Sequence, residues 1–408
     1  MERVLRRIGW RRVLVTAACV LVWRSVSTIP LAGLDLNRLG ALFSAQAHTG
    51  SLLAGLGSSE PFAQYSVGAL GVTPYIDAIV IMTLAAAFSR RVREMRRSRQ
   101  GLHRLRLWTR ALALGQAALL ADGSVHAIQR SGLLPDRIPW FTEMLLASEI
   151  TAGTAVLIAV ADVMDEYGLG LGFGPIWIYA LGPVVFETHR LAALITTAPS
   201  IEALYLPALV WIAASIAIAA VTVAAASAYR LVASQSEEED DGSPRIYAIG
   251  FLVSGVLRPA VMTFPLLNLP GSVALLFYSS NPDLANVILR SWLPDGPNPW
   301  WSAAYLGTEA IIILGATWVA VLADFSYWLP GSAAPHLSRL TLLSGLFLVL
   351  TVVLIPKIEL LGSSLAGHAL PMSGFDAVLV VALLFAAVRR MHPLPRRRAI
   401  QIPAPAFP

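Results

Sequence analysis

The sequence has little of what soluble enzymes and secreted domains are built on. Of its 408 residues a single one is cysteine, Cys19, and only 13% are charged. One cysteine excludes an internal disulfide framework and any cysteine-based metal cluster. Soluble domains usually carry about 25% charged residues, so the low charge argues against an ordinary soluble protein.

Motifs of the common catalytic chemistries are also missing. The seven histidines are scattered without the HExxH spacing of zinc proteases, and no nucleophile elbow is present. A P-loop of the G-x-x-x-x-G-K-[ST] type, which would bind a nucleotide, is absent as well. The sequence therefore predicts a protein that is not an enzyme and has no metal or cofactor. Any energy for its work would come from a partner.

Apolar residues are what the chain has in abundance, at 56% of the total. Apolar runs near 20 residues recur along the whole chain, and each is long enough to cross a bilayer core of about 30 Å. We therefore predict an all-α polytopic membrane protein with about ten membrane helices. The predicted spans are 11–31, 68–88, 104–122, 140–162, 172–190, 204–228, 246–269, 301–326, 338–356 and 372–391.

Arginine clusters predict the orientation of these spans. They lie before the first span, between the second and third spans, and after the last span. With ten spans all three clusters fall on one side, and the positive-inside rule makes that side the cytoplasm. We therefore expect a protein of the plasma membrane with both termini in the cytoplasm. The arginines are expected to contact anionic lipids rather than nucleic acid. The basic, proline-rich tail 393–408 is predicted to be disordered.

The segment Tyr65–Ala78, YSVGALGVTPYIDA, is an apolar run interrupted by glycine and proline. A membrane helix tolerates such breaks only where the freed backbone groups are buried in protein or face water. The segment therefore predicts a broken helix at a pore or binding site.

This segment resembles the start of the second membrane helix in the SecY family of protein-conducting channels. Further segments resemble that family in the same order along the chain. They are WRSVSTIPLAGLD (Trp23–Asp35), WTRALAL (Trp108–Leu114), TAGT (Thr151–Thr154), DVMDEYGLGLG (Asp162–Gly172), SGVLRP (Ser254–Pro259), RLTLLSGLFLVLTVVLIP (Arg339–Pro356) and SGFDAVLVV (Ser373–Val381). Their order and spacing match the family along nearly the whole chain.

The resemblance implies two inverted halves of five helices, 1–200 and 201–392, packed like a clamshell. It also implies an hourglass channel whose apolar waist excludes ions by dewetting while it is closed. The waist, or pore ring, would consist of Val72, Ile76, Phe173, Trp177, Ala260 and Leu379.

The resemblance further implies a plug and a lateral gate through which signal sequences pass into lipid. The plug would be a short helix at about 51–64 with the apolar side chains Leu52, Leu53, Leu56 and Phe62. The gate would open between the second and seventh helices. Its lining would be Pro74, Tyr75, Ile79, Met82, Leu257, Arg258, Val261 and Met262.

Several spans contain charges that the family pattern does not lead us to expect. Examples are Asp77, Arg258, Glu309 and Asp376. A charge in mid-bilayer costs about 2.5–3.5 kcal/mol on insertion scales, so it usually faces protein or water. We hypothesise that Arg258 pairs with Asp77 or Asp376 across the gate or pore.

The predicted cytoplasmic loops also depart from the family, which has long basic loops that receive a ribosome or a SecA-type motor. Here Ala233–Pro244 is short and acidic, and Trp328–Ser338 is short and nearly uncharged. The run Glu237–Asp241 would repel ribosomal RNA. A SecE-like small subunit, a SecG-like subunit and polypeptide substrates are expected partners, whereas the loops argue against the usual docking of a motor.

Two other functions stay open at this point. The broken helix and charges such as Asp77, Glu149 and Asp376 also fit a secondary transporter of small solutes. The shortened loops fit a SecY-derived assembly or insertion factor that does not conduct.

Overall fold

The computed structural model describes residues 2–35, 37–39, 65–95, 98–135, 137–170, 174–180, 229–234, 245–250, 258–278 and 280–292, followed by 307–308, 310–319, 342, 345–346, 349 and 383. The N-terminal half of the chain is therefore described almost continuously up to residue 180, apart from the connection 40–64. The C-terminal half is described as separate segments.

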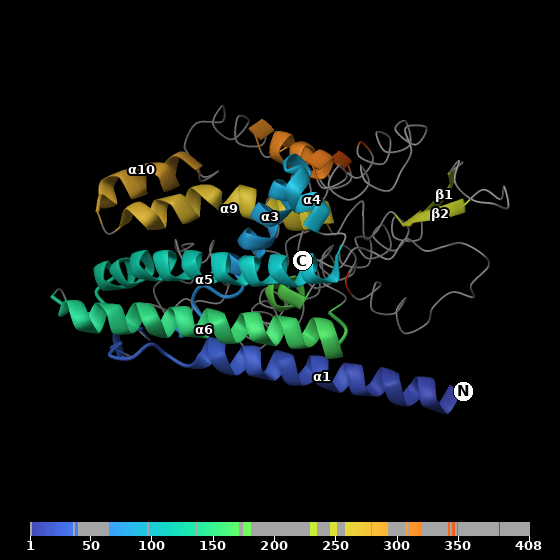
Figure 1. The fold of residues 1–408 in the computed structure, drawn as a ribbon. Coiled ribbons are helices and arrows are strands. Elements are labelled where there is room, and N and C mark those ends of the chain that lie inside the picture. Colours follow the sequence, from blue (N-terminus) through green and yellow to red (C-terminus); the bar gives the residue numbers. More distant parts are fainter. Residues whose placement is uncertain are drawn as a thin grey trace, which may run out of the picture.

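Long helices lie side by side in successive layers (Figure 1). The layers follow the order α1 (Glu2–Thr28), α6 (Trp140–Tyr167), α5 (Arg99–Arg130), and then α3 (Thr73–Phe88) with α9 (Arg258–Tyr278). The short helix α4 (Arg90–Met95) connects α3 to α5. This arrangement confirms the predicted all-α membrane core, while the number of ten spans stays a prediction.

Two of the described helices are long and apolar enough to cross a membrane by themselves, α5 over Gln100–Arg130 and α6 over Trp140–Tyr167. In both helices mostly small and branched residues are buried, and aromatic residues face outward. Leu105, Ala113 and Ala117 of α5 are fully buried, whereas Trp108 is more than half exposed. Such a surface suits lipid rather than water on the outside of the bundle.

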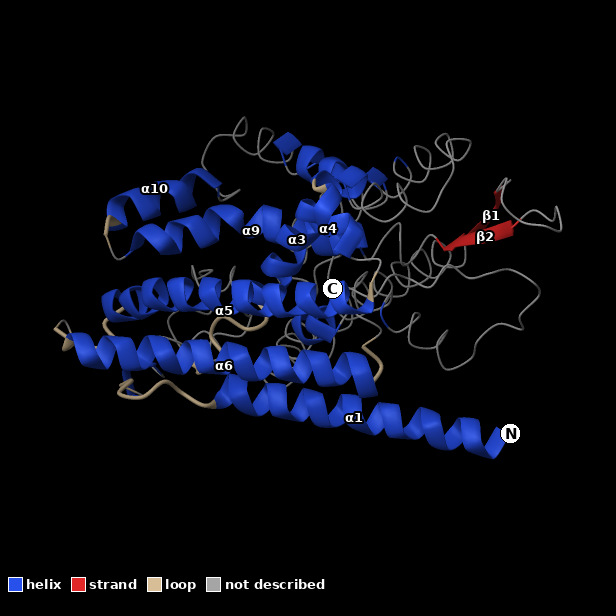
Figure 2. Cartoon of the chain, viewed as in Figure 1, coloured by secondary structure: helices blue, strands red, loops and turns tan. Residues whose placement is uncertain are grey.

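A two-stranded antiparallel hairpin is the first departure from prediction. Strand β1 (Tyr229–Ser234) pairs with β2 (Arg245–Gly250) from Tyr229 opposite Gly250 to Ser234 opposite Arg245. Figure 2 shows the hairpin apart from the helices, at the end of the molecule where α1 begins. The first residues of the predicted loop Ala233–Pro244 therefore belong to β1, and 235–244 lie outside the described residues. A local hydropathy pattern does not reveal strands that pair only with each other.

The seventh predicted span, 246–269, is wrong at both ends. Its first residues belong to β2, and helix α9 instead runs from Arg258 to Tyr278. Residues 251–257, between β2 and α9, lie outside the described residues.

The predicted connection 270–300 is partly helical. After α9 the chain turns and forms α10 (Pro282–Trp292), which packs back along α9 (Figure 1). Asn281 caps this helix, since its side-chain oxygen accepts a hydrogen bond from the backbone N–H of Leu284 at 3.1 Å. The Asn-Pro-Asp sequence at 281–283 was a helix-start signal that the hydropathy pattern hid.

Candidate functional site

The segment Tyr65–Val72 is a series of turns, and helix α3 begins only at Thr73. Gly71 has a φ of 57°, which other residues rarely adopt, and Pro74 stands in the first turn of α3. The predicted interruption of this segment is thereby confirmed, and we call the turns Tyr65–Val72 together with α3 the broken helix. Because the 16 residues of α3 reach only about 24 Å, the turns must make up part of any membrane crossing.

The turn segment is buried between helices α1 and α6, as an interrupted membrane segment requires. The backbone N–H of Gly68 donates to the Ser66 hydroxyl at 3.1 Å, and both residues are buried. Gly153 of α6 lies against the turn so closely that a Cβ atom would come within 2.0 Å of the Val67 carbonyl oxygen. Gly153 therefore allows α6 to cover the backbone of the broken helix.

A polar network joins α3 to the neighbouring helices. The hydroxyl of Tyr75 donates to Asp162 Oδ1 of α6 at 3.0 Å, and Arg110 of α5 forms an ion pair with Asp162 Oδ2 at 2.8 Å. Tyr75, which was predicted to line the gate, thus directs its polar end toward α5 and α6. The network holds the first turn of α3 to the N-terminal half.

Asp77 is buried, with 8% of its surface exposed. Its Oδ2 atom accepts a hydrogen bond from the Gln116 side chain of α5, and its Oδ1 atom has no partner among the described residues. The side chain of Arg258 and the whole of Asp376 lie outside the described part of the chain. Their predicted pairing with Asp77 therefore stays a prediction.

A small apolar cluster connects α3 with the C-terminal half. Val80 of α3 packs with Met262 of α9 and with Ala316 of the helix Ala310–Val319, and Leu84, Leu266 and Val319 surround them. Met262 was predicted to line the gate, whereas Val80 and Leu84 were not. They were accessible to sequence reasoning, because Ile76, Val80 and Leu84 recur every four residues and so share one helix face.

Helices α5 and α9 form a second contact between the halves. A Cβ atom at Gly123 would lie 2.2 Å from the carbonyl oxygen of Leu275, so the two backbones touch at this point. One to two turns further along, the guanidinium of Arg130 lies 5.2 Å from the centre of the Tyr278 ring, a cation–π contact. We call the combined α3–α9 and α5–α9 contacts the seam.

The connection that would carry the plug begins and ends at one place. Leu31 donates its backbone N–H to the Tyr65 carbonyl at 3.1 Å, and Val67 donates to the Ile29 carbonyl at 2.9 Å. These bonds flank an antiparallel bridge between Pro30 and Ser66. The two ends of the connection are therefore fastened beside the broken helix.

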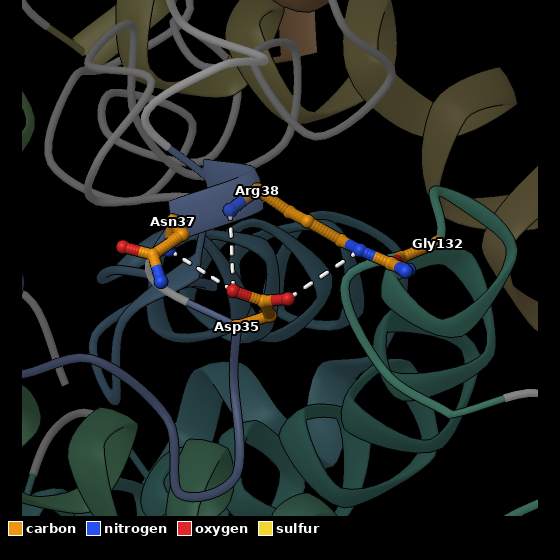
Figure 3. Close-up of polar contacts among 4 residues, drawn as sticks. All are labelled: Asp35, Asn37, Arg38 and Gly132. Carbon is orange, nitrogen blue, oxygen red and sulfur yellow. Dashed lines mark hydrogen bonds and ion pairs between the residues drawn. The ribbon is translucent and has the colours of Figure 1, made fainter.

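Asp35 anchors the start of that connection to the turn between α5 and α6 (Figure 3). Its Oδ1 atom accepts hydrogen bonds from the backbone N–H groups of Asn37 and Arg38, and its Oδ2 atom lies 3.4 Å from Arg38 Nε. Arg38 also donates to the Gly132 carbonyl at 3.0 Å. One carboxylate thus caps a short turn and positions the arginine that reaches α5.

The remaining predicted site residues divide by where they lie. Val72 and Ile76 of the pore ring are buried side by side on consecutive turns at the start of α3, and Trp177 is buried in the helical segment 174–180. Of the gate residues on α3, Pro74, Ile79 and Met82 are also buried. The side chains of Ala260 and Val261 on α9, together with Leu52, Leu53, Leu56, Phe62, Phe173, Leu257, Glu309 and Leu379, lie outside the described residues.

Comparison with known proteins identifies the family of this chain. The family model for SecY matches residues 66–327, more than half of the chain. This chain belongs to the SecY family. It is 27% identical to the protein translocase subunit SecY of Thermus thermophilus over 94% of this chain and 92% of that protein. A local match to SecY of Streptomyces scabiei, also at 27% identity, covers 40% of each chain.

Solved structures confirm the fold. A structure described as a protein conducting channel matches with a TM-score of 0.58 at 16% identity, over 93% of this chain and 91% of that chain. Sec61 in the canine ribosome–channel complex from the endoplasmic reticulum gives the same values. The SecY motifs in this chain have physical roles: TAGT supplies Gly153 beneath the broken helix, and the end of WRSVSTIPLAGLD supplies the Asp35 anchor.

Proposed function

We propose that this chain is the channel-forming subunit of a protein translocase, which moves polypeptides across or into the plasma membrane. The observation that carries the proposal is the seam beside the broken helix. Val72 precedes the first residue of α3, and Ile76 lies one turn before Val80, which packs on Met262 of α9. The pore residue Ile76 and the seam residue Val80 would therefore follow each other along one face of α3, with the pore at its start and the opening toward lipid further along.

The chemistry of these residues supports passage of a polypeptide rather than a small solute. Apolar side chains such as Val72 and Ile76 exclude hydrated ions when they close on each other. They make no specific contacts, so an extended chain of any sequence can displace them. In the seam, Val80 and Met262 are held together by apolar packing alone, which an apolar signal sequence can replace at little cost.

The plug would be at about 51–64, the part of the connection 33–64 that immediately precedes Tyr65. The bonds of Leu31 with Tyr65 and of Val67 with Ile29 support this proposal, because they fasten both ends of the connection next to the pore residues of α3. A segment fastened in this way can leave and re-enter the pore without moving its ends. The other predicted pore, plug and gate residues retain the roles proposed for them from the sequence.

The proposed orientation places the N-terminus, the arginine-rich α4 region and the β1–β2 hairpin in the cytoplasm. In support, the hairpin and the start of α1 lie at one end of the molecule, while the α5–α6 turn and the Asp35 anchor lie at the other (Figure 1). A SecE-like small subunit would brace the two halves, and a SecG-like subunit would complete the complex. In the sequence, the acidic run Glu237–Asp241 separates the two strands. A motor or ribosome would therefore need a basic surface to engage it.

The test is crosslinking of a stalled secretory chain to single cysteines in membranes, in a Cys19→Ala background. Ile76→Cys should form adducts that require a functional signal sequence. Val156→Cys is the matched control, because Val156 is an exposed residue on α6, away from the seam. Adducts at neither position, with both variants inserted in the membrane, or equal adducts at both, would refute conduction through this chain.

A further inference from the structure

Three side chains with metal-binding atoms converge at one end of the α5–α6 hairpin. Asp122 and His126 stand one turn apart on α5, and Glu143 stands in the first turn of α6. One ligand atom from each of the three lies within 4.8 Å of the ligand atoms of the other two. No local motif indicates this trio, since Glu143 comes from a different helix, and the sequence predicted no metal.

The geometry of His126 determines which of its nitrogens is available. Its Nδ1 atom lies 3.0 Å from the backbone carbonyl oxygen of Asp122. A carbonyl oxygen can only accept a hydrogen bond, so Nδ1 carries the proton. Nε2 of a neutral imidazole then presents a lone pair, and the contact of Nδ1 with a carbonyl is the usual way in which proteins orient a metal-binding histidine.

That lone pair faces another acceptor. His126 Nε2 lies 3.1 Å from Glu143 Oε1, and two acceptors at this distance repel each other unless a cation lies between them. A proton on Nε2 would join His126 to Glu143 but would give the Asp122 carboxylate no partner in this cluster. A divalent cation would satisfy all three groups, and 3.1 Å is close to the separation of about 3.3 Å between two ligands on a tetrahedral zinc ion.

We propose that Asp122, His126 and Glu143 form a binding site for a divalent transition-metal ion such as Zn²⁺, with water as the fourth ligand. One imidazole and two carboxylates suit zinc and its neighbours better than Ca²⁺ or Mg²⁺, which bind oxygen ligands. The side chains of His126 and Glu143 are 24% and 29% exposed, so an ion can reach them from outside.

The proposed ion would clamp α5 to α6 at the end of the hairpin. The next turn of α5 carries Arg130, which contacts Tyr278 of α9 across the seam. The site therefore lies where a bound metal would restrict the helix that forms the α5–α9 contact. This position follows from the described helices and does not depend on whether the chain conducts polypeptides.

The test measures metal binding directly with the full chain in detergent, together with whatever subunits co-purify. After treatment with a chelator, the protein is titrated with ZnCl₂ by calorimetry and with CoCl₂ by visible absorption. We expect one Zn²⁺ ion to bind per chain. Bound Co²⁺ should show the intense visible absorption bands of a four-coordinate ion. His126→Ala and Glu143→Gln should each lower the affinity at least tenfold.

His103→Ala is the matched control, since His103 is an exposed histidine at the other end of α5, and it should leave binding unchanged. Thermal unfolding without metal establishes that each variant is folded. Added Zn²⁺ should raise the Tm of the wild type and of His103→Ala but not that of His126→Ala. The proposal is overturned if the wild type binds no Zn²⁺ at about 100 μM; a Kd of that value corresponds to a binding free energy of roughly −5.4 kcal/mol. It is also overturned if folded His126→Ala binds Zn²⁺ as tightly as the wild type.

Discussion

Gly123 of α5 and Leu275 of α9 are in backbone contact, since a Cβ atom at Gly123 would lie 2.2 Å from the Leu275 carbonyl oxygen. The two residues belong to opposite halves of the chain. The nearest atoms to the Cβ position of Gly123 are backbone atoms of Leu275, and none of the three belongs to a flexible side chain. The closed seam therefore depends on the absence of a side chain at position 123.

Gly123→Ala should loosen the seam. The added methyl group would meet backbone atoms, which move only if the helices separate, at a cost of about 1–3 kcal/mol. We expect a raised ion leak through proteoliposomes that contain the variant. Gly115→Ala is the control, because a Cβ atom at Gly115 meets nothing within 4 Å; a leak that is equal in the two variants would contradict this reading.

Crosslinking the α3–α9 cluster should hold the gate closed. In a Cys19→Ala background, Val80→Cys with Met262→Cys should join under mild oxidation, because the two native side chains pack together. Transport of a secretory protein should fall at least tenfold and recover on reduction. Val80→Cys with Ile311→Cys should not join, since Ile311 is 72% exposed. Full transport by the joined protein would show that the seam does not open in function.

Gly153→Ala should destabilise the broken helix. Its Cβ atom would come within 2.0 Å of the Val67 carbonyl oxygen, so either α6 or the turn must move, again at a cost of about 1–3 kcal/mol. The expected result is a Tm several degrees below that of the wild type in detergent, with Gly115→Ala unchanged. A Tm equal to the wild-type value would mean that the turn is looser than the structure indicates.

The Tyr75–Asp162–Arg110 network should behave as a unit. Tyr75→Phe removes one hydrogen bond, worth about 1 kcal/mol, and Asp162→Asn weakens both that bond and the ion pair with Arg110. In a double-mutant cycle on unfolding, Tyr75→Phe should cost less in the Asp162→Asn background than in the wild type, because an amide oxygen accepts the tyrosine hydrogen bond more weakly than a carboxylate. Tyr167→Phe on α6, at an exposed position, should be additive with Asp162→Asn. Full additivity for Tyr75 would exclude coupling.

Asp35→Ala should free the connection that precedes Tyr65. The variant loses the two backbone hydrogen bonds to Asp35 and the contact that positions Arg38 on Gly132. Loss of such a cap costs about 1 kcal/mol, and a protease added from outside should cut the connection faster. Asp35→Asn retains the capping oxygen and should be cut at a rate between those of the wild type and Asp35→Ala. Equal rates in all three would rule out the anchor.

Membrane class, the break before Thr73 and the family were predictable from the sequence. Apolar runs identify lipid-spanning helices because length and hydropathy are local properties, and Gly71 and Pro74 mark a break for reasons of local backbone geometry. The β1–β2 hairpin and α10 were missed, since Arg245–Gly250 and Pro282–Trp292 were assigned by hydropathy to a span and to a loop.

The site itself was only partly accessible. Ile76 and Met262 were named from the motifs, and both are buried beside the seam. The partners of Asp77 and Tyr75 were not, because Gln116 and Asp162 come from helices far along the chain. Hydrogen bonds between helices depend on how each helix is rotated, and a single sequence carries no direct record of that rotation.

The sequence by itself determined that this protein spans a bilayer, that its second predicted membrane segment is interrupted and that it belongs to the SecY family. Composition, the positions of glycine and proline, and the order of the motifs are properties of the chain alone. Only the tertiary structure decided that Gly153 covers the break, that Gly123 meets Leu275 and that Asp122, His126 and Glu143 converge. These relationships arise when helices pack, since packing brings together residues that neither periodicity nor spacing connects.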